Sequence, residues 1–200
     1  WRMLDRSDWS HLAEGPLVRG WAVALAGYPL CPEVRITDIT RCARAATARA
    51  AEMVDGPLLL SGHSAGGHLA SRMVCADTVM PAEVAVRVKG VLGISGVYDL
   101  RPLRRTAMNE TLRMDAAEAA AESPILAEPR AGARFIAWVG AAELPEFVRQ
   151  NAAIVNLWHG LGAHTHCVEA PGRHHFDVVD PLCDPQSDLT QALVGLAASA

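Results

Sequence analysis

The residues best suited to chemistry lie in one short turn, Gly62-His63-Ser64-Ala65-Gly66, which matches the pattern Gly-x-Ser-x-Gly. A serine hydroxyl is a weak nucleophile, so a site that uses it must hold Oγ clear of the backbone, facing a base and a substrate. The flanking glycines, Gly62 and Gly66, lack Cβ and let the backbone pass close to itself there. The turn therefore predicts nucleophilic acyl transfer at Ser64.

The sequence on either side of the turn predicts the elements that such a nucleophile needs. The apolar run at residues 57–60 indicates a buried strand, and the Ala-rich stretch from Ala65 to Met80 indicates a helix that Pro81 ends. A helix N-terminus presents backbone N–H groups to a developing oxyanion. We expect the N–H of Ala65 to be one donor of this oxyanion hole. The five-residue pattern also arises by chance in Gly/Ser loops, so the flanking elements carry the interpretation.

A base and an acid for the serine are expected in loops after later strands, because active groups collect at the carboxyl ends of parallel strands. The loop after the last predicted strand contains His174 and His175, and either imidazole could serve as the base. The acid should orient that imidazole without taking its proton. Glu143 directly follows a predicted strand, whereas Glu146 falls in the first turn of the next helix, where a carboxylate commonly complements the helix dipole. We therefore prefer Glu143.

The other histidines predict no metal site. An H-x-H pair could bind a metal, but no third ligand stands at a suggestive spacing. We expect ordinary surface or packing roles for His11, His68, His159, His164 and His166.

Composition limits the class of protein. The chain has 200 residues, 50% of them hydrophobic and 20% charged, which predicts one globular domain over residues 1–200. A net charge of −4 argues against a nucleic-acid partner, and no apolar run approaches the roughly 20 residues of a membrane span. Five cysteines without C-x-x-C spacing predict reduced thiols and a cytoplasmic location. No cofactor is expected.

Strands and helices alternate along the chain, which predicts an α/β protein with a mostly parallel sheet flanked by helices. Residues 100–123 interrupt this alternation and predict a small inserted cap. The remaining strands are expected at residues 21–28, 88–97, 134–139 and 164–169, and the remaining helices within residues 1–17 and at 36–54, 145–161 and 188–198.

Several stretches together carry a more specific pattern than the turn alone. They are Trp1-Arg2 with Asp8-Trp9-Ser10, Tyr28 to Glu33, Gly62 to Ala70, Ser95 to Leu100, Met108-Asn109-Glu110, Glu143 to Phe147 with Arg149-Gln150, and Gly172 to Phe176. They resemble the arylformamidase (kynurenine formamidase)-like α/β-hydrolases, and the chain is also similar to carboxylesterases of the hormone-sensitive-lipase type. The resemblance covers essentially the whole chain.

The resemblance implies an α/β-hydrolase fold in which Ser64, Glu143 and His175 are nucleophile, acid and base. It selects His175 over His174, because the family's base directly precedes a phenylalanine. The family also has a His-Gly-Gly-(aromatic)-Trp segment whose glycine N–H groups build half of the oxyanion hole. This chain starts at that Trp, so we expect an N-terminally truncated fold whose second oxyanion donor lies upstream of Trp1.

The expected function is hydrolysis of an aryl formamide, such as N-formylkynurenine, or of a short-chain carboxylic ester. Trp1 and His63 are candidate substrate contacts in an aromatic-walled pocket. A general carboxylesterase is the main alternative, since the turn and the triad are common to both. An inactive fragment or a binding protein of the same fold is the other, because half of the oxyanion hole is missing. A small-molecule substrate is the expected partner, and a homodimer is an allowed assembly.

Overall fold

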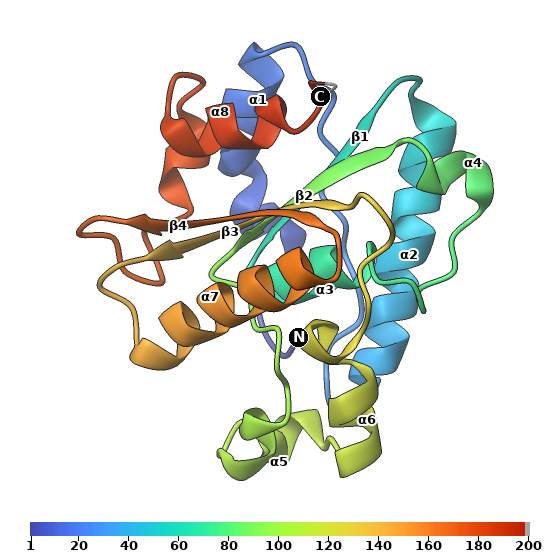
Figure 1. Ribbon diagram of the computed structural model, residues 1–200, viewed down its shortest axis with the longest axis vertical. Coiled ribbons are helices and arrows are strands. Elements are labelled where there is room, and N and C mark those ends of the chain that lie inside the picture. Colours follow the sequence, from blue (N-terminus) through green and yellow to red (C-terminus); the bar gives the residue numbers. More distant parts are fainter. Residues whose placement is uncertain (199–200) are drawn as a thin grey trace.

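A four-stranded parallel sheet lies at the centre of the computed structural model, which describes residues 1–198 (Figure 1). Its strands, β1 (Leu58–His63), β2 (Val88–Ile94), β3 (Arg134–Gly140) and β4 (His164–Ala170), lie side by side in chain order. Each neighbouring pair is parallel. The carboxyl ends of all four strands therefore meet at one edge of the sheet, and the predicted α/β class is confirmed.

Helices cover both faces of the sheet, with α3 (Ala65–Arg72) and α7 (Pro145–Gly160) on one side and α8 (Asp188–Gly195) on the other (Figure 1). Strand side chains alternate between the two faces, so β2 supplies both layers. Its Leu92 packs into the α8 layer with Leu189, whereas Val91 packs with Trp158 of α7. A strand that is covered by helices on both faces has a nearly continuous apolar sequence. For this reason β2 could be predicted from its composition.

The remaining helices lie around this centre. They are η1 (Arg6–Ala13), α1 (Glu14–Val18), α2 (Ile36–Met53), α4 (Ala82–Ala85), η2 (Pro102–Arg105), α5 (Asn109–Leu112), α6 (Ala116–Ala121), η3 (Pro124–Leu126) and η4 (Asp180–Cys183). The long helix α2 starts where the Asp38 carboxylate accepts from the N–H of Arg35, and it buries Ile36 and Ile39 completely. None of the helices in residues 1–198 has the length and apolar composition to cross a membrane.

The segment predicted as a cap, residues 100–123, contains η2, α5 and α6, and α5 and α6 project away from the sheet (Figure 1). It is attached to α2 by polar contacts: Glu118 accepts from Arg35 Nε at 2.9 Å, and Thr40 donates to Glu122 at 2.7 Å. Leu112 is buried in the same apolar cluster as Ile36. Residues 100–123 are therefore packed against α2.

The prediction of a strand at residues 21–28 is wrong. No residue of this segment is in a strand, and Val23 and Leu25 are 37% and 39% exposed. A strand exists only when a neighbour accepts its hydrogen bonds, and this segment pairs with neither edge of the described sheet, β1 or β4. The apolar composition of this segment favours a strand, but none of the described strands pairs with it.

The helix after the serine is shorter than predicted, because α3 ends at Arg72 and not near Met80. Beyond that point the backbone bonds to a distant segment: Ala76 N–H donates to Glu128 at 2.8 Å, and Arg130 N–H donates to Val74 at 2.8 Å. These long-range bonds replace the helical ones, although alanine-rich sequence would allow the helix to continue.

Candidate active site

Ser64 occupies a strained turn between the last residue of β1, His63, and the first residue of α3, Ala65. Its φ of 54° and ψ of −111° lie in a region that side-chain-bearing residues rarely adopt. Two backbone bonds hold it there: Ser64 N–H donates to Ile94 O at 2.8 Å, and His68 N–H donates to Ser64 O at 3.2 Å. The serine is thus presented at the carboxyl edge of the sheet.

The glycines of the turn have different roles. A Cβ on Gly62 would lie 2.3 Å from the carbonyl carbon of Gly66, and one on Gly67 would lie 2.8 Å from Gly96 Cα. A Cβ on Gly66 would meet nothing within 4 Å. The interpretation that both flanking glycines allow the close approach therefore needs correcting, because the approach requires Gly62 and Gly67 but leaves space at Gly66.

Glu143 and His175 are joined by a hydrogen bond of 2.7 Å between Oε2 and Nδ1. The other carboxylate oxygen accepts from Ser95 Oγ at 2.5 Å and from Gly140 N–H at 2.8 Å. Burial raises the pKa of Glu143, but the hydrogen bonds from His175, Ser95 and Gly140 outweigh it and the pKa is lowered. An ionised carboxylate can only accept, so Nδ1 of His175 carries the proton and Nε2 is free to take one.

The loops after β3 and β4 bring these two residues together. Ala142 N–H donates to Arg173 O at 2.9 Å, and a Cβ on Gly140 would lie 2.3 Å from the same oxygen. The His175 side chain is 19% exposed and lies between two rings, with centroid distances of 4.7 Å to His63 and 4.3 Å to Phe147. The imidazole is therefore fixed on three sides while part of it faces solvent.

The structure separates the two histidines that the sequence left open. The His174 side chain is 58% exposed, and its Nδ1 accepts from Phe176 N–H at 3.1 Å and lies 3.3 Å from Asp177. Only His175 contacts the buried Glu143. The alternative acid, Glu146, pairs with Arg149 at 2.7 Å on the exposed surface of α7.

His63, the residue before Ser64, contacts the Glu143–His175 pair. His63 Nε2 lies 2.8 Å from the main-chain oxygen of His175. Within residues 1–198, Ser64 Oγ itself makes no hydrogen bond, and such bonds are often long before substrate binds. The Ala65 N–H, at the start of α3, has no acceptor in the described residues, as expected for the first turn of a helix.

The predicted substrate contacts differ in accessibility. Trp1 is 8% exposed, stacks edge-on against His68 with centroids 5.1 Å apart, and belongs to the apolar cluster that α2 shares with residues 100–123. That position favours packing over substrate contact. His63 is half-buried and is engaged with His175. His68 is fully buried, with Nε2 donating to Glu122 O at 2.7 Å, which agrees with the packing role expected for it.

Ser95 contacts the candidate acid Glu143 and was not singled out from the sequence as a candidate site residue. It directly follows β2, is fully buried, and has a φ of 48°. Its N–H donates to Trp138 O at 2.6 Å, which directs the hydroxyl to Glu143. The position of Ser95 in the sequence could have indicated this contact. Ser95 precedes Gly96 at the end of a predicted strand, and such strand ends lie at the same edge of the sheet as Ser64.

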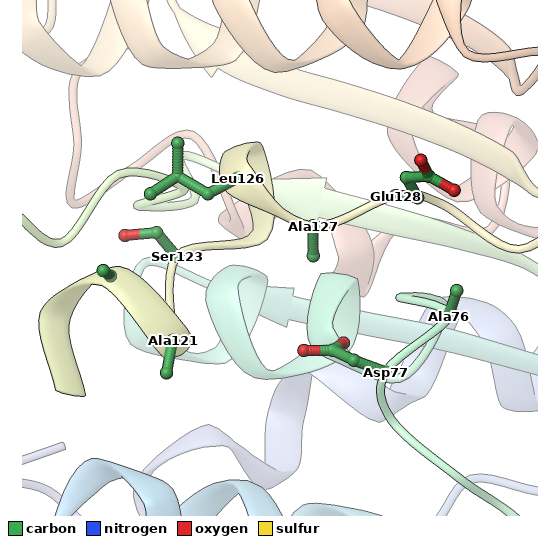
Figure 2. Close-up of a pocket in the computed structure, with 8 residues that line it drawn as sticks. Ala76, Asp77, Ala121, Ser123, Leu126, Ala127 and Glu128 are labelled. Atoms are coloured by element: carbon green, nitrogen blue, oxygen red, sulfur yellow. The ribbon is translucent and has the colours of Figure 1, made fainter. Parts of the chain in front are cut away.

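The hollow shown in Figure 2 is not this site. It has a volume of about 320 Å³, and its lining includes Ala76, Asp77, Ser123, Leu126 and Glu128. It lies beyond the C-terminal end of α3, whereas Ser64 precedes the N-terminus of that helix, and eight helical residues span about 12 Å. Among residues 1–198, no group of three His, Cys, Asp or Glu side chains could hold a metal ion.

A parallel sheet with a strained serine between the strand β1 and the helix α3, and a carboxylate–histidine pair in the loops after β3 and β4, defines an α/β-hydrolase fold. No protein-family model matches the chain. Kynurenine formamidase of Danio rerio is 26% identical over 203 residues, which cover 97% of this chain and 68% of the relative.

Two solved structures extend the comparison. A protein of Silicibacter sp. TM1040, described as a candidate thioesterase, is 47% identical with a TM-score of 0.91, over 97% of this chain and 72% of that one. An esterase/lipase from an uncultured bacterium matches in fold, with 20% identity and a TM-score of 0.68 over 94% of this chain and 68% of that one. The chain belongs to the same α/β-hydrolase family as the Silicibacter protein, and it is related to kynurenine formamidases and esterases.

Proposed function

We propose that the chain is a serine hydrolase that cleaves an aryl formamide or a short-chain carboxylic ester through an acyl-enzyme on Ser64. The observation that carries this proposal is the buried Glu143–His175 hydrogen bond of 2.7 Å, at the same sheet edge as the strained serine. A carboxylate that fixes the tautomer of an imidazole is what a weak hydroxyl nucleophile requires. A structural ion pair alone would not need a strained serine beside it.

In the first half of the reaction, Ser64 Oγ bonds to the carbonyl carbon of the substrate and its proton passes to His175 Nε2. The charged imidazolium is stabilised by Glu143, which keeps its own charge. The oxyanion forms beside the N–H of Ala65 at the start of α3. The C–N or C–O bond then breaks, and the leaving amine or alcohol takes the proton back from His175.

In the second half, a water molecule replaces the leaving group. His175 takes a proton from the water as its oxygen bonds to the acyl carbon, and the acyl–Oγ bond breaks with return of that proton to Ser64. The released acid is formate from a formamide, or a short carboxylic acid from an ester. Deacylation thus needs only residues that acylation already uses.

An aryl formamide such as N-formylkynurenine is our first substrate, supported by the kynurenine formamidase relatives. The apolar cluster next to the turn also supports it: half-buried Tyr28, Met108 and Phe147 pack on the same cluster as Ala65 and provide a surface for an aryl group. Short-chain esters are the second candidate, because the structural relatives include esterases. A thioester belongs to the same acyl-transfer chemistry and provides a third comparison.

The proposal is tested by labelling the protein with a fluorophosphonate and mapping the adduct by mass spectrometry. Labelling is expected at Ser64, to be lost in Ser64→Ala and to be kept in Ser10→Ala, which changes an exposed serine of η1. An adduct at another serine contradicts the nucleophile. Ligand binding without any adduct or product would instead favour a binding protein of this fold.

The substrate class is tested with N-formylkynurenine, p-nitrophenyl acetate and a short acyl thioester. A formamidase should have a kcat/KM for the formamide at least comparable to that for the activated ester. A preference of about 100-fold or more for the ester, equal to about 2.7 kcal/mol in transition-state binding, would rule out the formamidase assignment. A similar preference for the thioester would identify a thioesterase.

A further inference from the structure

We infer that His63 is a positioning residue: its Nε2–H donates to the main-chain oxygen of His175 and thereby holds the loop of the proposed base beside Ser64. The observed contact is 2.8 Å long. The inference rests on the proposed hydrolase function, and it gives His63 a role other than the substrate contact expected from the sequence. It concerns the backbone of His175, whereas Glu143 holds only the side chain.

His63 is itself rigidly placed. It is the last residue of β1, paired with Ile94 of β2, and it directly precedes the strained Ser64. Because one peptide joins His63 to the nucleophile, a bond from its ring to the His175 loop sets the distance between nucleophile and base. The connection between nucleophile and base therefore runs through one side chain, that of His63.

The bond also fixes the protonation of His63. A carbonyl oxygen can only accept, so Nε2 carries the proton. Two titratable groups act on this ring: the His175 imidazole, with centroids 4.7 Å apart, and the Glu143 carboxylate beyond it, while Trp9 of η1 contributes an uncharged ring 5.8 Å away. Burial, together with the charge of His175, lowers the pKa of His63 to about 4. His63 therefore stays neutral, so it positions the base without placing a second positive charge beside it.

The backbone of His175 has little other support. Neighbouring residues of the loop are anchored, because Arg173 O accepts from Ala142 N–H and His174 N–H donates to Asp177 at 2.7 Å. Within the described part of the chain, the bond from His63 is the one hydrogen bond that the backbone of His175 makes. Without this bond, the backbone of His175 makes no hydrogen bond within the described residues, and only its side chain and its anchored neighbours hold it in place.

Two substitutions test the N–H donor of His63 and its ring independently. His63→Phe keeps a flat ring between Trp9 and His175 but removes the donor, whereas His63→Gln keeps an N–H donor on a chain of similar reach. His174→Gln is the matched control, since His174 lies in the same loop and is exposed. Thermal unfolding of each variant checks that the fold is kept.

The first measurement is the second-order rate of fluorophosphonate labelling at Ser64. A small misplacement of a catalytic group costs up to about 10²-fold, so His63→Phe should react about 30- to 100-fold more slowly, and His63→Gln within about 5-fold of wild type. His174→Gln should react like wild type. An unchanged rate in His63→Phe, or an equal loss in a folded His63→Gln, overturns the inference.

The second measurement does not depend on activity. Nitrogen-15 NMR of the histidines reports the tautomer and titration of His175 directly, and His63→Phe should shift the His175 signals while His174→Gln leaves them unchanged. If the wild-type protein fails to label but these signals still respond, the hydrolase proposal fails and the positioning of His175 stands. If labelling occurs and the signals do not respond, the positioning role is wrong.

Discussion

Nδ1 of His175 lies 2.7 Å from Oε2 of Glu143, a side chain with no solvent exposure. The residues come from loops after two neighbouring strands, β3 and β4, and are 32 positions apart in sequence. All three donors to the carboxylate, from His175, Ser95 and Gly140, converge at the carboxyl edge of the sheet.

Glu143→Gln should lower kcat by about 10³-fold, because a neutral amide cannot stabilise the imidazolium that forms at His175. KM should change little, since the Glu143 side chain has no solvent exposure and contacts the imidazole of His175. The matched control is Glu146→Gln on α7, where the carboxylate pairs with Arg149 at the surface. Steady-state kinetics of both variants test the assignment, and a larger kcat loss in Glu146→Gln would reverse the choice of acid.

His175→Ala should reduce kcat by about 10³-fold or more, whereas His174→Ala should stay within about 3-fold of wild type. The reason is geometric, because only His175 contacts Glu143 while His174 is bonded within its own loop. The measurement is kcat for both variants on the better of the three substrates. A greater loss in His174→Ala would show that the base is assigned to the wrong histidine.

Ser95→Ala should lower kcat by about 10-fold and destabilise the protein by about 1.5 to 3 kcal/mol, the range for a hydrogen bond to a charged group. Ser95→Gly removes the same hydroxyl but relieves the positive φ of 48°, so it should be about 1 kcal/mol more stable than Ser95→Ala. Kinetics and urea unfolding of both variants check this. Equal kcat with unequal stability is expected; full activity in either variant would exclude a role for the hydroxyl.

Gly62→Ala should destabilise the protein by about 2 to 4 kcal/mol, because its methyl group would lie 2.3 Å from the backbone of Gly66. Gly66→Ala should be neutral or stabilising by about 0.5 to 1 kcal/mol, since the added methyl meets nothing within 4 Å and alanine favours α3. Urea unfolding of the two variants measures the difference. The reverse order of stability would show that the turn is built differently.

The protein should lose stability on acidification below about pH 6.5, because His68 is fully buried and burial lowers its pKa to about 3. In the unfolded chain the imidazole of His68 takes up a proton near pH 6.5, whereas in the folded chain it stays neutral down to its lowered pKa of about 3. Between these two pKa values the free energy of unfolding therefore falls by about 1.4 kcal/mol per pH unit. His68→Gln keeps a donor to Glu122 O and removes the titration. Its stability should therefore depend less on pH between 6.5 and 4.5; an unchanged slope would contradict the assignment.

The sequence by itself determined the class of fold and the position of the candidate nucleophile. Both depend on patterns only a few residues long: glycines at fixed spacing around Ser64, and apolar runs that alternate with amphipathic helices. Glu143 could also be proposed as the acid and the loop of His174 and His175 as the source of the base, because strand ends in a parallel sheet meet at one edge. The family resemblance, and not this geometry, selected His175 over His174.

Tertiary structure decided what depends on a distant partner. Residues 21–28 have the composition of a strand but pair with no edge of the described sheet. The helix after Ser64 ends at Arg72 because the backbone there bonds to residues 128–130, more than 50 positions away. Ser95 and His63 acquire their roles from contacts with Glu143 and His175 across 48 and 112 positions. No local pattern encodes such contacts, since they exist only once the strands have brought these loops together.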